Sequence, residues 1–138
     1  MANGMYDAGR NAFLQGDIDW LVDDIRVVLV DVTGGTYVPS LAADDFLADI
    51  PVADRVAVMP AQMTGKTAVA GVADAADVTL AAVTGDQSEA IVVYKHTGSD
   101  ATAALIAFFD TATGLPVLPN GGNITIAWDN GANKIFKL

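Results

Sequence analysis

The feature that most constrains the fold of this chain is its choice of acidic residue. Sixteen of the 17 acidic residues are Asp, and Glu89 is the single Glu. Asp is unfavourable inside helices because its short side chain competes for backbone hydrogen bonds, and the same property suits it to caps and turns. The chain also contains 13 Gly. The sequence therefore predicts short strands separated by many turns.

The length of 138 residues fits one domain. A domain of this size buries roughly two thirds of the surface that its unfolded chain exposes. Hydrophobic residues make up 52% of the chain, which favours a packed core over disorder. No interior linker or repeat is visible. We interpret residues 1–138 as a single structural domain, with residues 1–20 as an N-terminal helix or arm.

Composition narrows the function classes. The absence of Cys excludes disulfides, thiolate nucleophiles and cysteine-ligated metal sites. A net charge of −10 argues against a nucleic-acid partner, because Lys and Arg must neutralise phosphates. The N-terminus lacks the pattern of a secretory signal, and no apolar run approaches the roughly 20 residues that cross a bilayer. We expect a soluble protein made in a cytosol, without a membrane partner.

Two short helices are predicted in the N-terminal third. The first spans Asp7 to Gln15; Asp7 accepts hydrogen bonds at its start, Gly16 ends it, and its apolar contacts are Phe13 and Leu14. The second spans Ser40 to Ile50, before Pro51. In that segment four apolar residues fall near one another at helical spacing, namely Leu41, Phe46, Leu47 and Ile50.

Strands are predicted over most of the remaining chain. The β-branched run Ile25 to Val32 indicates a strand buried on both faces. Segments AIVVY and ALIAFF are also apolar on both faces, which indicates central strands of a covered sheet or a subunit interface. Alternation in NITIAWD instead indicates a half-buried strand. The further candidates are Arg55 to Met59, Thr67 to Ala73, Val78 to Val83, Glu89 to Lys95, Ala103 to Asp110, Asn123 to Trp128, and Lys134 to Leu138.

The links between these strands are too short for crossover helices, so neighbouring strands are expected to pair antiparallel. The predicted fold class is therefore mainly β. We expect an antiparallel β-sandwich or barrel of about eight short strands, with one or two short helices in the N-terminal third.

Three motifs suggest chemistry only weakly. Thr64-Gly65-Lys66-Thr67 resembles the end of a phosphate-binding loop, but Pro60 stands where that loop needs its first Gly, and a polar turn before a strand explains it better. His96 is the single His. A Ser-His-Asp triad would need Ser40, Ser88 or Ser99, but none of these lies in a G-x-S-x-G elbow. No catalytic residue is therefore assigned.

Metal binding is the third possibility weighed from the residues. The closest carboxylate groupings are Asp23-Asp24, Asp44-Asp45 and Asp74 with Asp77. None has the alternating spacing of a calcium loop, and one His without Cys makes a zinc site unfavourable. We interpret the aspartates as caps and turns, and we assign no metal ligand and no cofactor; an interface metal stays open.

Several segments resemble a family of small virion structural proteins of tailed bacteriophages. The likeness spans nearly the whole chain, and its closing segment is the most distinctive. It is carried by AFLQGDIDWLVDDIRVVLVD, DDFLADIP, GVADAADVTLAAVTGD, AIVVYKHTG and FFDTATGLPVLPNGGNITIAWDNGANKIFKL. The resemblance implies a structural component, without catalytic residues, that assembles in the bacterial cytoplasm.

Within that class the leading hypothesis is a capsid decoration, or cement, protein on the head surface of the virion. Its expected partners are the major capsid protein and itself, as a homotrimer or another small symmetric oligomer. Two alternatives stay open. One is a tail, connector or baseplate component; the other is a host-glycan-binding module with sugar-stacking residues Trp20, Trp128 and Tyr94.

Four residues are the candidate partner contacts: Tyr6, Arg10, Trp20 and Phe108. The first two lie in the segment Met1 to Arg10, which is predicted either to reach a neighbouring subunit as an arm or to cover one end of the sandwich. Phe108 and Phe109 are adjacent in a predicted strand and so face opposite sides. Core packing is the main interpretation of both rings, and a face that a partner protein covers is the alternative for one of them.

Overall fold

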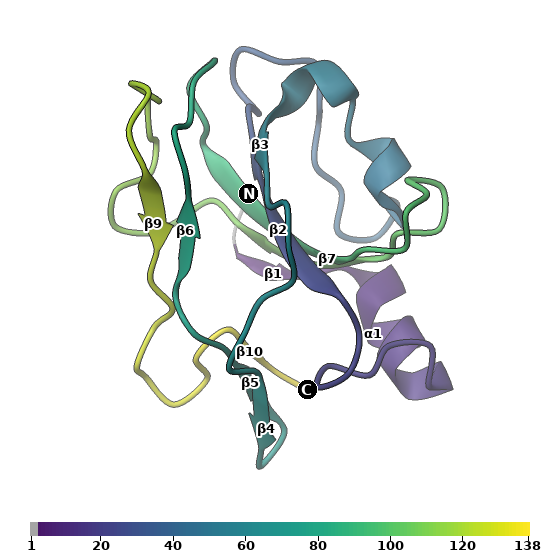
Figure 1. Cartoon of the computed structure of the whole chain (residues 1–138). Coiled ribbons are helices and arrows are strands. Elements are labelled where there is room, and N and C mark those ends of the chain that lie inside the picture. Colours follow the sequence, from purple (N-terminus) through teal and green to yellow (C-terminus); the bar gives the residue numbers. More distant parts are fainter. Residues whose placement is uncertain (1–2) are drawn as a thin grey trace.

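The computed structural model of the chain describes residues 3–138 and is mainly β (Figure 1). One α-helix lies near the N-terminus, and two 3-10 helices, η1 and η2, precede the third strand. In chain order the elements are β1 (Gly4–Met5), α1 (Asp7–Gln15), β2 (Ile25–Val30), η1 (Leu47–Asp49), η2 (Val52–Asp54), β3 (Arg55–Val58), β4 (Thr67–Val69), β5 (Val72–Asp74), β6 (Val78–Leu80), β7 (Ala90–Lys95), β8 (Leu105–Phe109), β9 (Ile124–Ile126) and β10 (Phe136–Lys137).

A five-stranded antiparallel sheet in the order β1-β8-β7-β2-β3 forms the centre of the molecule. The β-branched run of β2 pairs with β7 along its whole length, from Ile25 opposite Lys95 to Val30 opposite Ala90. Side chains on both faces of these central strands are buried. The predicted antiparallel, mainly β fold is thus confirmed, with ten short strands in place of about eight.

Both faces of the central sheet are covered by the chain itself. On one face, Val28 and Val30 pack with residues of the segment 37–50, including Tyr37 and Ile50. On the other face, Val27 and its neighbours pack with α1, the 18–20 segment and the smaller sheets. Those smaller sheets have the orders β10-β5-β4 and β6-β9. The result is a sandwich-like arrangement around two apolar clusters.

The prediction of a helix over Ser40 to Ile50 is wrong. Turns occupy its first half, and only Leu47–Asp49 forms a single 3-10 turn. Asp44 accepts the N–H of Ser40 at 2.8 Å, at the first residue of the segment, where a helix would leave that N–H unpaired. The cause is competition from a second carboxylate: Asp49 accepts the N–H groups of Asp45 and Phe46 at 2.8 and 2.9 Å. These local bonds replace the backbone bonds of a helix. The apolar spacing instead reflects two buried residues, Leu47 and Ile50, on an irregular segment.

The first predicted helix is confirmed over its full length, and Gly16 ends it in the left-handed conformation. Two details of that prediction are wrong. Asp7 makes no capping hydrogen bond, because Tyr6 occupies the cap position, and Leu14 is 85% exposed. The helix packs through Gly9 and Ala12 instead. A Cβ at Gly9 would come within 2.7 Å of the Leu105 carbonyl oxygen, so this close approach to β8 requires Gly.

The strand predicted over Thr67 to Ala73 is a hairpin of two strands. Its turn consists of Ala70 and Gly71, which both have positive φ, +53° and +79°. Two such residues between paired strands form a tight hairpin connection. The sequence did not indicate this turn, because Ala is not a typical turn residue. The hairpin β4–β5 projects from the body at the bottom of Figure 1.

Candidate functional site

Several carboxylates hold loops by accepting hydrogen bonds from backbone N–H groups. The buried Asp54 accepts hydrogen bonds from the Thr36 and Tyr37 backbone N–H groups, at 2.9 and 2.8 Å, and from the Thr36 hydroxyl. Asp31 accepts the N–H groups of Thr33 and Gly34. The interpretation of Asp as a cap and turn residue is confirmed at these positions.

The three carboxylate groupings considered for metal binding are divided among cationic and backbone partners. Asp24 bonds the Arg26 guanidinium at 2.8 Å, and this bond lowers the pKa of Asp24. Asp23 contacts the Lys95 ammonium at 3.0 Å. Asp74 pairs with Lys134, which lowers the pKa of Asp74. Among residues 3–138, no group of three or more His, Asp or Glu side chains is arranged to hold a metal ion.

The motifs considered for catalysis have structural contacts. Thr64 to Thr67 leads into β4 rather than into a helix, and the Lys66 ammonium donates to the Asp23 carbonyl oxygen. The Ser88 hydroxyl is buried and shares its one proton between the carbonyl oxygens of Val30 and Ala90, at 3.1 and 3.0 Å. Ser88 and His96 flank opposite ends of β7, so they lie roughly 25 Å apart at about 3.3 Å per strand residue.

Three of the four predicted partner contacts lie in the core. Tyr6 and Phe108 are both 0% exposed and pack edge to face, with ring centroids 6.4 Å apart. Trp20 is 5% exposed, and its indole N–H donates to the Asp74 carbonyl oxygen. Their aromatic character therefore reflects packing within the chain. Arg10 is exposed on α1.

The described part of the N-terminal segment is docked rather than extended. Gly4 and Met5 pair with Phe108 and Ala107 of β8, and the N–H of Tyr6 donates to the Ile106 carbonyl oxygen at 2.9 Å. Over residues 3–10 the structure therefore has the end-covering arrangement and not the arm. Met1 and Ala2, the start of the predicted arm, lie outside the described residues.

The sheet face opposite Phe108 is also covered within the chain. Phe109 packs against Trp128, with ring centroids 6.1 Å apart. Both rings therefore pack within the chain, which agrees with the core interpretation and leaves no need for a partner-covered face at either of them. Of the three residues considered for sugar stacking, Trp20 and Tyr94 are buried and only Trp128 is partly exposed. The three rings therefore do not form an exposed platform for a sugar.

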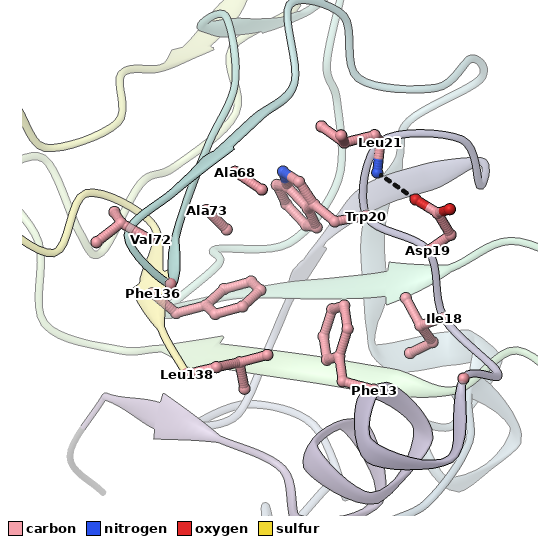
Figure 2. A pocket seen from close by; sticks show the side chains of 12 residues that line it. Phe13, Ile18, Asp19, Trp20, Leu21, Ala68, Val72, Ala73, Phe136 and Leu138 are labelled. Carbon is pink, nitrogen blue, oxygen red and sulfur yellow. Dashed lines mark hydrogen bonds between the residues drawn. The ribbon is translucent and has the colours of Figure 1, made fainter.

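An apolar groove of about 380 Å³ lies between α1, the 18–21 segment and the β4–β5–β10 sheet (Figure 2). Three aromatic rings form its floor: Phe136 lies 5.7 Å from Phe13 and 5.2 Å from Trp20, centroid to centroid. Leu21 and Leu138, both exposed, line its rim. Sequence reasoning missed this site, because its walls come from three segments far apart in the chain.

A second hollow, of about 320 Å³, adjoins the first and shares Phe13 and Leu138 with it. It is lined by Met5, Arg10, Phe13, Leu14, Lys137 and Leu138, and we name it the basic groove. Five of the seven cations bond carboxylates or carbonyl oxygens elsewhere in the chain. Within the described residues, Arg10 and Lys137 make no ion pair. Although the chain is acidic overall, these two cations lie beside the exposed Leu14 and Leu138 without an ion-pair partner among the described residues.

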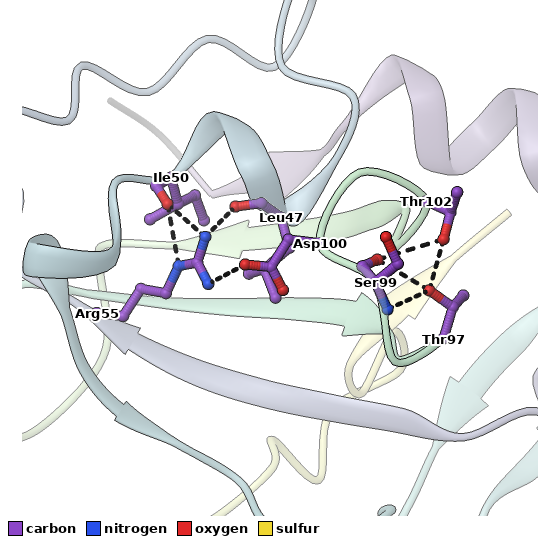
Figure 3. Close-up of polar contacts among 7 residues, drawn as sticks. All are labelled: Leu47, Ile50, Arg55, Thr97, Ser99, Asp100 and Thr102. Atoms are coloured by element: carbon purple, nitrogen blue, oxygen red, sulfur yellow. Dashed lines mark hydrogen bonds and ion pairs between the residues drawn. The ribbon is translucent and has the colours of Figure 1, made fainter.

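A buried guanidinium supports the segment around η1 (Figure 3). The Arg55 side chain, 9% exposed, donates to the carbonyl oxygens of Leu47 and Ile50 at 2.8 Å and to Asp100 at 2.7 Å. It therefore holds η1 against β3 and the loop before β8. We name the exposed residues that this segment presents, Asp45, Phe46 and Asp49, the acidic loop.

The third surface feature is an open strand edge. β4 lies at the edge of the three-stranded sheet, and all three of its residues are exposed. The Ala73 carbonyl oxygen accepts the Ile135 N–H, so the polar groups of Ala73 face β10. Ala68, which is opposite Ala73, therefore directs its own N–H and C=O away from β5.

Comparison with known proteins assigns no family to the chain. No protein-family model matches it, and no curated protein matches its sequence. Among the described residues, no helix has the length and apolar character needed to span a membrane.

Proposed function

We propose that this chain is a non-enzymatic virion structural protein of a tailed bacteriophage, and most specifically a capsid decoration protein. Its partners are the major capsid protein and further copies of itself. The sequence segments that resemble small phage structural proteins support the class. The observation that carries the mode of action is the open edge of β4 on a projecting hairpin.

An exposed strand edge offers unpaired N–H and C=O groups to a strand of another protein. In β4 the side chains are small or apolar, namely Thr67, Ala68 and Val69, so a partner strand meets no charged side chain there. The hairpin is joined to the body at Asp74, whose carbonyl oxygen accepts the Trp20 indole N–H and whose carboxylate pairs with Lys134. Contacts that order the hairpin before binding reduce the entropy lost on binding. A partner strand at β4 would thereby join two virion proteins into one sheet.

Such contacts would hold neighbouring capsid subunits together. Each specific contact of ordinary size buries about 1,200–2,000 Å² in total, and a symmetric shell repeats that contact at every equivalent site. Contacts that exist only in the intact shell raise the free energy needed to rupture it. The net charge of −10 also keeps the free subunit from adsorbing to DNA.

The test uses heads of the phage that encodes the chain, prepared without this protein. Added wild-type protein should co-sediment with these heads and raise the temperature at which they release DNA. Ala68→Pro removes the outward N–H and should abolish both effects, whereas Ala68→Ser keeps the N–H and should retain them. Heads that bind no protein, or that gain no heat resistance from it, would refute the decoration role.

Copy number in purified virions separates the head from the tail. Hundreds of copies per particle place the chain on the head surface. Six, twelve or another ring multiple would instead support a tail, connector or baseplate component. A glycan array with the purified protein provides the remaining check, and we expect no binding because Trp20 and Tyr94 are buried.

A further inference from the structure

We infer that the basic groove of one copy binds the acidic loop of a second copy, so that the chain assembles head to tail. The inference deepens the self-association included in the proposed function, and it names the two surfaces. It does not depend on whether the assembled protein sits on a capsid.

The first argument is charge complementarity. With 17 acidic and 7 basic residues, most of the surface of a second copy repels an acidic neighbour. The basic groove is the exception, because Arg10 and Lys137 have no carboxylate partner among the described residues. Asp45 and Asp49 supply the complementary charge on the acidic loop, and both are exposed.

The second argument is that both surfaces carry exposed apolar groups. Leu14 is 85% exposed and Leu138 is 59% exposed beside the two cations of the groove. On the acidic loop, Phe46 is the exposed aromatic residue, and the Asp49 carboxylate bonds its backbone N–H at 2.9 Å. Aromatic anchors that enter apolar pockets, ringed by charge pairs, are typical of the central residues of protein interfaces.

The third argument is placement. The two surfaces share no residue, and they border opposite faces of α1. Asp45 and Phe46 line a hollow with Ala8, Asn11 and Gln15 of that helix, whereas Arg10 and Leu14 line the basic groove with Lys137. In Figure 1 the 3-10 helices are at the upper right, above α1, while β10 and the C-terminal residue lie in the lower half of the view. A contact between two different surfaces is heterologous and leaves one groove and one loop free on each pair, so further copies add until a ring closes. A contact of ordinary size takes about 800 Å² from each copy, out of a surface of 6894 Å².

The test is the molar mass of the purified chain in solution, by sedimentation or light scattering across a concentration series. The wild-type chain should form a discrete oligomer. Arg10→Glu, Leu14→Glu and Asp45→Arg should each raise the dissociation constant at least tenfold. Val38→Glu is the matched control for Leu14→Glu, because Val38 is 83% exposed and lies outside both surfaces. It should leave the oligomer intact.

The decisive variant is the double exchange Arg10→Glu with Asp45→Arg in one chain. It restores an opposite charge across every groove–loop contact, so it should recover the oligomer that each single exchange loses. A monomeric wild-type chain would overturn the inference, as would a double variant no better than the singles, or equal loss in Val38→Glu. An oligomer with this pattern that fails to bind heads would refute only the decoration role, whereas a monomer that binds heads would refute only this contact.

Discussion

At the scale of single residues, Asp54 replaces the backbone acceptor that the loop at 33–37 lacks. One of its oxygens accepts three hydrogen bonds, and the residue is 4% exposed. Removing it leaves the N–H groups of Thr36 and Tyr37 without their partner in a site that water enters poorly. We expect Asp54→Ala to lower the free energy of unfolding by about 2–3 kcal/mol. Urea unfolding measures this change.

The matched control is Asp86→Ala, because Asp86 is exposed on a turn. It should change stability by less than about 0.5 kcal/mol. Asp54→Asn keeps one acceptor oxygen and should fall between the two. Equal stability of Asp54→Ala and Asp86→Ala would contradict the role assigned to the buried carboxylate.

Ala70 is the second residue whose local conformation makes a measurable prediction. Its φ of +53° is a left-handed conformation, which costs an L-residue with a Cβ about 1 kcal/mol. Asn tolerates this conformation, and Asn-Gly is the preferred pair for such a hairpin turn. Ala70→Asn should therefore raise the free energy of unfolding by about 0.5–1 kcal/mol.

Thermal unfolding followed by circular dichroism measures the gain. Ala53→Asn serves as the control, since Ala53 is exposed and is not among the residues with positive φ. That control should show no increase. A loss of stability in Ala70→Asn would show that the turn is not the one described.

At the scale of elements, one side chain fixes the segment from η1 to η2. Arg55 joins the carbonyl oxygens of Leu47 and Ile50 to the Asp100 carboxylate, and it does so with three separate nitrogens. A lysine ammonium is a single point charge and cannot reproduce that planar fork. We expect Arg55→Lys to loosen the segment and to lower the free energy of unfolding by about 2 kcal/mol.

Hydrogen exchange locates the effect. The N–H groups of Leu47 and Ala48 bond the carbonyl oxygens of Ala103 and Asp100. Their exchange should accelerate in Arg55→Lys much more than exchange at the centre of β2, which is paired on both sides. Uniform acceleration across the chain would instead indicate only a global loss of stability. Arg10→Lys, on the exposed side of α1, should leave both patterns unchanged.

The elements also show which parts of this fold a sequence specifies. The strands β2, β7 and β8 could be predicted because their apolar, β-branched runs are buried on both faces, as the residues alone require. The 40–50 segment could not, because Asp49 bonds the N–H groups of Asp45 and Phe46, which a helix would use. Local hydrogen bonding there overrides the apolar spacing.

The candidate site was still less accessible to prediction. Tyr6 and Phe108 are predicted as interface residues, but both lie in the core. The sequence does not distinguish the two roles, because an aromatic side chain is buried both in a core and in an interface. The basic groove depends on Arg10 and Lys137 lining one hollow, although they lie near opposite ends of the chain. No spacing in the sequence indicates that placement. The exposure of Leu14 likewise follows from the close packing of Gly9 on β8, which sets the rotation of the helix.

At the scale of the whole molecule, all three tyrosines report on the intact fold. Tyr6, Tyr37 and Tyr94 are buried, and burial is the main cause that raises the pKa of each hydroxyl above its ordinary value of 10.0. Tyr37 donates to Asp44 at 2.7 Å and accepts a hydrogen bond from the Tyr6 hydroxyl at 3.1 Å, so a phenolate at that position would face a carboxylate. The folded chain therefore retains these protons at a pH where the unfolded chain releases them.

The sign of the pH dependence follows from this difference. The raised pKa values stabilise the fold fully below pH 10, the ordinary tyrosine value, and this stabilisation is lost progressively as the pH rises beyond it. Phenolate absorbance should therefore appear in one cooperative step that coincides with the loss of near-ultraviolet circular dichroism. Tyr37→Phe should reduce the amplitude of that step by about a third while keeping it cooperative. Independent titration of the tyrosines near pH 10 with the fold intact would contradict the burial of all three rings.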